Sequence, residues 1–65
     1  MKLSEKIRIL RKARGLSQEE LAELINTSRT TISMIETARQ NPTVLKIIDI
    51  SNVLKIDINE LTKGV

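Results

Sequence analysis

The chain has 65 residues, contains no Cys, His, Phe, Tyr or Trp, and carries a formal net charge of +3. The missing Cys and His exclude disulfides, the usual zinc ligands and catalysis by thiol or imidazole, and the missing aromatic rings exclude base stacking as a grip on single-stranded nucleic acid. A chain of this length is expected to form one small domain, residues 1–65, with an aliphatic core. No apolar stretch reaches the ~20 residues of a membrane span and no signal peptide follows Met1, so a cytoplasmic location is expected.

The charges are unevenly distributed along the chain. Residues 1–14 hold six Lys or Arg against one acid, whereas residues 17–25 hold three Glu and no base. This asymmetry predicts one basic face, as a nucleic-acid binder needs. Surface charge that only keeps a small domain soluble is the alternative interpretation.

Hydrophobic periodicity predicts five helices, joined by short connections that lack strand patterns. The first runs from Leu3 to Arg14, with apolar residues at positions 3, 7 and 10, and ends at Gly15. The other four are expected at 18–25, 29–36 or 37, 44–54 and 58–62, and residues 63–65 are expected to fray. Their predicted N-caps are Ser17, Ser28, Thr43 and Asp57, the last of them with Glu60 three residues on.

Residues 17–36, SQEELAELINTSRTTISMIE, read as two short helices with a tight turn between them. Ser17 and Glu20 have the spacing of a capping box, and Asn26 tolerates the left-handed conformation that such a turn needs. The first helix carries an apolar stripe of Leu21, Ala22, Leu24 and Ile25. In the second helix Ile32 and Ile35 share one side, and the other side is polar with one positive charge. A short polar helix braced by a preceding helix is typical of a helix-turn-helix that reads the DNA major groove.

The apolar residues at helical spacing define an expected core. The helix at 44–54 is apolar on more than one side, and one small domain does not cover all of that surface. Two interpretations of this excess apolar surface stand equally. One is a homodimer that forms through the C-terminal helices, to which Ile56, Ile58 and Val65 contribute, and the other is ordinary surface exposure of Ile and Val. The predicted core residues are Leu3, Ile7, Leu10, Leu16, Leu21, Ile25, Ile32, Ile35, Ile47, Ile50, Leu54 and Leu61.

Five segments together resemble one family: IRILR at 7–11, GLSQEELA at 15–22, SRTTISMIE at 28–36, NPT at 41–43 and LKIDINEL at 54–61. They resemble the Cro/C1-type helix-turn-helix proteins, the phage-repressor-like DNA-binding domains, over nearly the whole chain. The resemblance implies an all-α fold of five helices and sequence-specific binding to double-stranded DNA as a symmetric dimer. The family usually has Gly where this chain has Asn26, Ala38 and Lys55. Because Ala resists positive φ, the loop after the third helix is expected to be shaped differently.

Helical spacing places four side chains on the side of the third helix opposite its two Ile residues. The guanidinium of Arg29 suits guanine O6 and N7, and Met34 offers an apolar contact to a thymine methyl. A gap-filler at the domain edge is the alternative for Met34. The predicted base-contacting residues are Arg29, Thr30, Ser33 and Met34, and the predicted phosphate-contacting residues are Gln18, Ser28, Arg39, Asn41 and Thr43.

Two structural roles follow from the family resemblance alone. Gln18 occupies the position that bonds a phosphate and braces the first residue of the recognition helix, here Arg29. Arg11 and Glu36 occupy positions that form a partly buried ion pair, which ties the first helix to the end of the third.

The expected function is therefore a sequence-specific transcriptional regulator that binds double-stranded DNA, a repressor acting as a homodimer on a palindromic operator with half-sites ~34 Å apart. A protein-interaction module, such as an antitoxin-type partner of another protein, is the alternative. No enzyme activity is expected, because the Ser, Thr, Asp, Glu and Lys residues form no recognisable nucleophile–base pair. No cofactor, metal, small-molecule substrate or membrane partner is expected.

Overall fold

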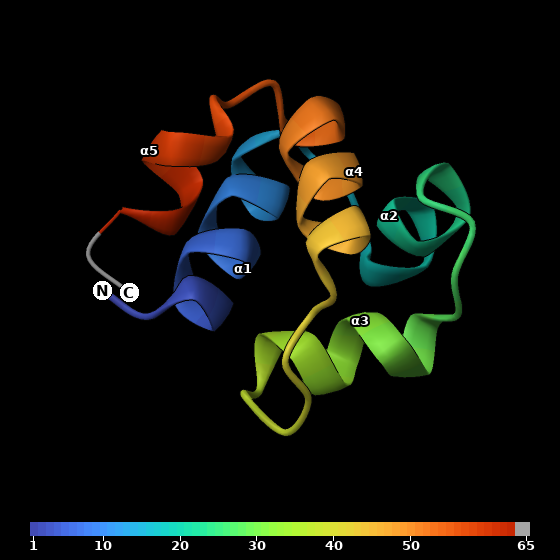
Figure 1. Ribbon diagram of the computed structural model, residues 1–65. Coiled ribbons are helices and arrows are strands. Elements are labelled where there is room, and N and C mark those ends of the chain that lie inside the picture. The colour runs from blue at the N-terminus through green and yellow to red at the C-terminus, as the bar shows by residue number, and fades with distance from the viewer. Residues whose placement is uncertain (64–65) are drawn as a thin grey trace.

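The computed structural model describes residues 1–63. Within them the fold is all-α, which confirms the predicted class, and the helix ends lie within one residue of the predicted ones. The predicted fraying concerns in part residues 64–65, which lie outside the described residues. In chain order the helices are α1 (Leu3–Ala13), α2 (Gln18–Leu24), α3 (Arg29–Glu36), α4 (Val44–Leu54) and α5 (Ile58–Thr62) (Figure 1).

The helices are arranged so that α3 lies at one edge of the molecule. α2 and α3 pack against each other, and α3 also contacts α1. α5 packs against α1 and α4 on the other side (Figure 1). The long outer side of α3 is therefore left free of the other helices, as a helix that enters a groove requires.

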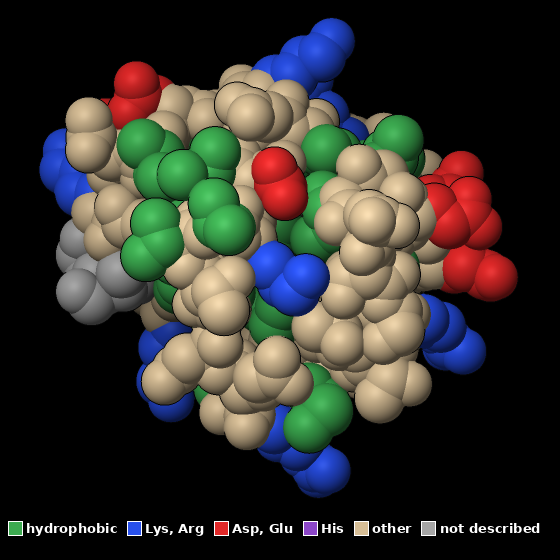
Figure 2. Space-filling view, turned by 45° about the vertical axis from the view of Figure 1, so that its right-hand side comes forward, with side chains coloured by type: hydrophobic (Ala, Val, Ile, Leu, Met, Phe, Trp, Pro, Cys, Tyr) green, Lys and Arg blue, Asp and Glu red, His purple; other side chains and the backbone are tan. Residues whose placement is uncertain are grey.

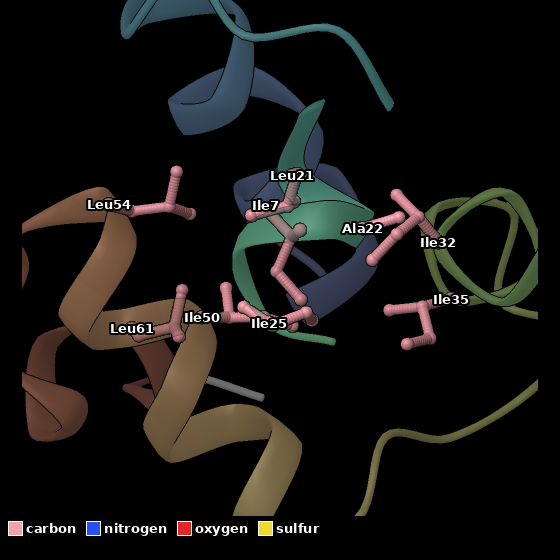
Figure 3. Close-up of a cluster of buried hydrophobic side chains, with 9 residues drawn as sticks. All are labelled: Ile7, Leu21, Ala22, Ile25, Ile32, Ile35, Ile50, Leu54 and Leu61. Carbon is pink, nitrogen blue, oxygen red and sulfur yellow. The ribbon is translucent and has the colours of Figure 1, made fainter. Parts of the chain in front are cut away.

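Nine aliphatic side chains fill the centre, and every helix contributes to them (Figure 3). Eight belong to the predicted core, and Ala22 joins them from the predicted apolar stripe of α2. Four predicted core residues pack against this cluster while remaining partly exposed. The buried cluster comprises Ile7, Leu21, Ala22, Ile25, Ile32, Ile35, Ile50, Leu54 and Leu61, and the partly exposed four are Leu3, Leu10, Leu16 and Ile47.

The predicted place of Leu24 in the apolar stripe of α2 is wrong. Its side chain is 59 % exposed, whereas Leu21, Ala22 and Ile25 are buried. At about 100° per residue, position 24 lies roughly a quarter-turn or more away from the middle of the stripe that the other three define.

The four predicted N-caps are all in place. Ser17 Oγ accepts from the Glu20 N–H at 3.0 Å while Glu20 Oε1 accepts from the Ser17 N–H at 2.9 Å, so the predicted capping box is confirmed. Ser28 and Thr43 cap α3 and α4 without a reciprocal bond: their hydroxyls accept from the Thr31 N–H and the Lys46 N–H. Asp57 caps α5 by accepting from the Asn59 N–H at 2.7 Å.

Helices α1 to α4 end in the same way, although four different residue types occupy the key position. In each, a residue with positive φ follows the helix, and the next N–H donates to the carbonyl five residues back, which is the Schellman motif. The residues with positive φ are Gly15 (71°), Asn26 (57°), Ala38 (60°) and Lys55 (55°). The closing bonds join Leu16 to Arg11, Thr27 to Ala22, Arg39 to Met34 and Ile56 to Ser51.

The expectation that Ala38 would give the loop after α3 a different shape is therefore wrong. Ala38 adopts the left-handed conformation that glycine usually supplies, at a cost of about 1–2 kcal/mol for its Cβ. The Arg39 and Gln40 N–H groups both donate to the Met34 carbonyl, at 2.9 and 3.2 Å, and these bonds hold the turn closed.

Candidate nucleic-acid interface

The outer side of α3 carries the side chains that the sequence assigned to base contacts. Arg29, Thr30 and Met34 are exposed and Ser33 is half-buried, whereas the α3 residues between them that face the core are buried. Because Ser28 caps the helix through the Thr31 N–H at 3.2 Å, α3 begins at Arg29 and places this side chain in its first turn. The helical register therefore sends these four side chains away from the core.

A hollow of about 430 Å³ opens on this side of the molecule, and we call it the α3 hollow. None of its lining side chains is acidic and two are arginines, so it suits the negative potential of DNA and the acceptor-rich edge of guanine. It brings together all four predicted base-contacting residues and two of the predicted phosphate-contacting residues. The lining residues are Gln18, Arg29, Thr30, Ser33, Met34 and Arg39.

Arg39 lies in the α3 hollow although it follows the helix by three residues. The positive φ of Ala38 turns the chain back on itself, and the Arg39 N–H donates to the Met34 carbonyl at 2.9 Å. From its place in the sequence after α3, Arg39 was predicted only to contact a phosphate. The turn instead puts Arg39 beside the residues predicted to contact bases.

The implied ion pair between Arg11 and Glu36 is confirmed, and it is bidentate. Arg11 Nε lies 2.7 Å from Glu36 Oε2, and Arg11 Nη2 donates to Glu36 Oε1 at 3.0 Å. The two side chains are only 8 % and 1 % exposed. Arg11 Nη1 donates to the Leu16 carbonyl at 2.7 Å, so the pair ties α1 to both the end of α3 and the turn before α2.

Gln18 is joined to this ion pair, which the sequence did not reveal. Its Nε2 donates to Glu36 Oε1 at 3.2 Å, whereas the family resemblance implied Arg29 as the partner of this side chain. Gln18 and Glu36 are 18 residues apart, and no helical spacing connects them in the sequence. The bond links the structural ion pair directly to a lining residue of the α3 hollow.

The remaining predicted phosphate contacts lie outside the α3 hollow. The hydroxyls of Ser28 and Thr43 are engaged as N-caps, the latter accepting from the Lys46 N–H at 3.2 Å. Asn41 lines a separate, smaller hollow of about 190 Å³ between the start of α1 and the loop after α3. The structure therefore groups Gln18 and Arg39 with the base-contacting set, and it does not group the other three with it.

The basic segment 1–14 does not act as a single free basic surface. Arg11 is buried in the ion pair, Arg14 Nε donates to the Leu54 carbonyl at 3.0 Å, and Lys6 Nζ donates to the Glu60 carbonyl at 3.2 Å. Lys and Arg side chains are scattered over the face seen in Figure 2, both around its outline and near its middle, and acidic side chains lie among them. Three of the six bases counted along this segment thus serve the fold.

Residues 1–63 show neither a candidate metal site nor a candidate membrane-spanning helix. No cluster of three or more Asp or Glu side chains in this range has the arrangement of a metal site. None of the helices in the same range has the length and apolar character needed to cross a bilayer.

Comparisons of the sequence identify relatives. The family model described as helix-turn-helix matches residues 7–61. The HTH-type transcriptional activator BcrR of Enterococcus faecalis is 38 % identical over 64 residues, which are 98 % of this chain and 31 % of BcrR. The chain thus spans about a third of the length of this curated relative.

Solved structures share both the fold and part of the sequence. The restriction-modification controller protein C.AhdI from Aeromonas hydrophila is 34 % identical with a TM-score of 0.86, and the match covers 91 % of this chain and 89 % of C.AhdI. The P22 c2 repressor, solved in complex with a synthetic operator, is 26 % identical with a TM-score of 0.91, over 100 % of this chain and 98 % of that one. With the family model matching most of its length, the chain belongs to the Cro/C1-type helix-turn-helix family.

Proposed function

We propose that residues 1–65 form one DNA-binding domain of a transcriptional regulator, with α3 as the helix that enters the major groove. The α3 hollow carries this proposal, because it presents two arginines, several short polar side chains and no acidic side chain along the outer side of α3, which the other helices leave free. The P22 c2 repressor, which has the same fold, was solved with an operator bound. The proposal assigns no residue a catalytic role.

Base contacts come from the side chains of α3 in this proposal. Arg29, in the first turn, reaches guanine O6 and N7 with two parallel donors. Thr30 and Ser33 are short and contact a near base edge directly or through a water. Met34 contacts a base through its apolar end.

Phosphate contacts come from residues that flank α3. Arg39 and Gln18 lie in the α3 hollow and are closest to the proposed groove-facing side. The assignments of Ser28, Asn41 and Thr43 to phosphates remain predictions from the sequence. Such contacts supply affinity and make it salt-dependent, while base contacts supply specificity.

We further propose that the protein represses transcription in the cytoplasm as a homodimer that forms through its C-terminal helices. The supporting observation is the exposed apolar surface of α4, where Val44 is 69 %, Leu45 74 % and Ile48 39 % exposed. Hydrophobic side chains form a visible group on the face in Figure 2. A single domain of this size touches few bases, so two copies on a two-fold operator provide useful affinity.

Selection from a random pool of double-stranded DNA at near-physiological salt, followed by sequencing, tests the proposal. The wild-type protein should enrich a palindrome whose half-sites contain guanine. Arg29→Ala should lose the preference for that guanine, at a cost of about 1–3 kcal/mol in binding free energy.

Arg8→Ala is the matched control, because Arg8 is an exposed arginine of α1 that does not line the α3 hollow. It should bind the selected palindrome with the wild-type base preference. If the wild-type protein enriches no sequence, the regulator function is contradicted, and a protein-partner function becomes the better explanation of the exposed apolar surface.

A further inference from the structure

We propose that the sulfur of Met34 is a site of reversible oxidation, and that the resulting sulfoxide weakens DNA binding at the α3 hollow. The oxidant is hydrogen peroxide or another peroxide, and methionine sulfoxide reductases reverse the change. The inference rests on the proposed DNA-binding function, and it adds a means by which oxidising conditions control that function.

The sequence confines this oxidation chemistry to two side chains. The 65 residues contain no Cys, Trp, Tyr or His and only two Met, Met1 and Met34. Cysteine thiolates compete strongly for peroxide, so their absence leaves the two thioethers as the groups that an oxidant attacks. Both are accessible: Met1 is 67 % exposed and does not line the α3 hollow, whereas Met34 is 36 % exposed and lines it.

Met34 lies where peroxide reaches its side chain and where bound DNA would cover it. It is the single apolar residue among the six that line the α3 hollow. The other apolar residues of α3, Ile32 and Ile35, are buried in the core, and Met34 is not among the residues described as packing against that core. Its carbonyl accepts from the Arg39 N–H at 2.9 Å and the Gln40 N–H at 3.2 Å, and these bonds fix the last turn of α3. A change at the sulfur therefore alters the hollow and leaves the core intact.

The oxidation transfers one oxygen atom to Met34. A lone pair of the sulfur attacks one oxygen of hydrogen peroxide, the O–O bond breaks, and an S–O bond forms. The proton on the transferred oxygen moves to the departing oxygen, which leaves as water. Sulfur loses two electrons and the peroxide gains them, so a thioether and hydrogen peroxide give a sulfoxide and water.

The sulfoxide changes what the α3 hollow presents to DNA, because an apolar side chain becomes a polar one with an acceptor oxygen. Phosphates offer only acceptors, and guanine presents only acceptors in the major groove. Under bound DNA the new oxygen is either buried without a donor or takes a donor from Arg29 or Arg39, which is then lost to its proposed contact. Both outcomes weaken binding, and one unsatisfied buried acceptor lowers the affinity by about fivefold or more.

Bound DNA and oxidation of Met34 are expected to exclude each other. DNA in the α3 hollow covers the sulfur and keeps peroxide away from it. Met1 lies outside the hollow, so DNA should leave it open to the same oxidant. The two Met residues thus provide an internal comparison within one protein.

The experiment treats the wild type and Met34→Leu with hydrogen peroxide and titrates each with the palindrome obtained by selection. Each treated protein is compared with its own untreated sample, and mass spectrometry of peptides locates the added oxygen. Met34→Leu is the matched control, because it keeps an apolar side chain in the hollow and retains Met1 as an oxidisable residue. Part of the oxidised wild type is then treated with methionine sulfoxide reductases for both epimers, and circular dichroism gives the Tm of every sample.

The oxidised wild type should bind the operator about fivefold or more weakly than the untreated protein, and the reductases should restore its affinity. Its Tm should not change. Met34→Leu should bind equally before and after treatment, although its Met1 is oxidised. In the wild type, saturating operator should protect Met34 from peroxide and leave Met1 unprotected.

The inference is overturned if peroxide oxidises Met1 but not Met34, or if protein with oxidised Met34 binds as tightly as untreated protein. An equal loss of affinity in Met34→Leu, a loss that accompanies a fall in Tm, or a loss that the reductases do not reverse also overturns it. Operator binding that oxidation leaves unchanged keeps the proposed function standing, whereas a protein that binds no operator before treatment overturns both.

Discussion

The pairing of Arg11 with Glu36 shows how a small aliphatic domain tolerates two charges in its interior. Removing two charges from water is costly, and the cost is offset only when geometry and hydrogen bonds are nearly complete. Here both carboxylate oxygens accept from Arg11, the third guanidinium nitrogen donates to the Leu16 carbonyl, and Gln18 adds a further donor. Within residues 1–63 no buried side-chain polar atom lacks a partner.

Removing one member of this ion pair is predicted to lower the free energy of unfolding far more than removing both members. Arg11→Met leaves a buried carboxylate without its cation, and we expect a loss of about 3–5 kcal/mol in the free energy of unfolding. For a domain of this size that corresponds to a fall in Tm of more than about 12 °C, measured by circular dichroism. The double variant Arg11→Met, Glu36→Leu should recover most of the loss, because it leaves no buried charge. A wild-type Tm for Arg11→Met would contradict the structural role of the pair.

The lowered pKa of Glu20 predicts that the stability of the fold depends on pH. The backbone N–H of Ser17, and secondarily its side chain, hold the pKa of Glu20 below its usual value of 4.5 by hydrogen bonding to the carboxylate. A carboxyl group whose pKa is lower in the folded state stabilises the fold above its unfolded pKa, and that contribution disappears as the pH falls through the folded pKa.

Urea denaturation of the wild type and Glu20→Gln at a series of pH values measures this contribution. The glutamine Oε1 can still accept from Ser17, so the comparison isolates the charge. The wild type should have the higher urea midpoint above pH 4.5, and the difference should shrink as the pH is lowered further. If the difference in urea midpoint between the two proteins stays constant down to acid pH, the charge of Glu20 in the capping box is not its cause.

Helices α1 to α4 end with the same backbone conformation, although a different residue type has the positive φ in each. Gly15, Asn26, Ala38 and Lys55 all adopt positive φ, because the carbonyls of the preceding turn need donors and the reversed chain supplies them. Glycine adopts this conformation without a steric penalty, whereas Ala and Lys do not. The turn after α3 therefore stores a small amount of strain directly beside the α3 hollow.

Ala38→Gly is predicted to stabilise the protein. Relief of the Cβ strain outweighs the extra conformational entropy that glycine loses, and we expect a net gain of about 0.5–1 kcal/mol in the free energy of unfolding. Urea denaturation measures it. Gly15→Ala is the reciprocal control: its Cβ would meet no atom within 4 Å, so the expected destabilisation comes from the φ of +71° alone. A lower stability for Ala38→Gly would contradict the assigned strain.

At the scale of the whole molecule, the five short helices within residues 1–63 bury nine aliphatic side chains and leave part of α4 uncovered. A domain of this size buries a limited share of its surface, and its stability is correspondingly small. The exposed residues Val44 and Leu45 lie at the start of α4, directly after the loop that follows α3. Contact between two copies at this surface would couple assembly to the spacing of two recognition helices.

Leu45→Gln is predicted to weaken the proposed dimer without unfolding the monomer, since Leu45 is 74 % exposed. Sedimentation at high micromolar concentration should show a dimer for the wild type and a shift towards monomer for this variant. Leu24→Gln is the matched control, because Leu24 is 59 % exposed on α2 and should leave the dimer intact. A monomeric wild type, with one copy bound per operator, would contradict dimerisation through α4.

The sequence by itself determined the helices, the N-caps of α2 to α5 and the four side chains on the outer side of α3, because helical periodicity and capping depend on residues within one or two turns of each other. The ion pair of Arg11 and Glu36 followed only from the family resemblance, and the tertiary structure confirmed it. The tertiary structure alone decided the bond from Gln18 to Glu36, the use of Arg14 and Lys6 in the fold, and the entry of Arg39 into the α3 hollow. These features join residues that are distant in sequence or depend on a turn that overrides the preference of Ala38, so no local pattern encodes them.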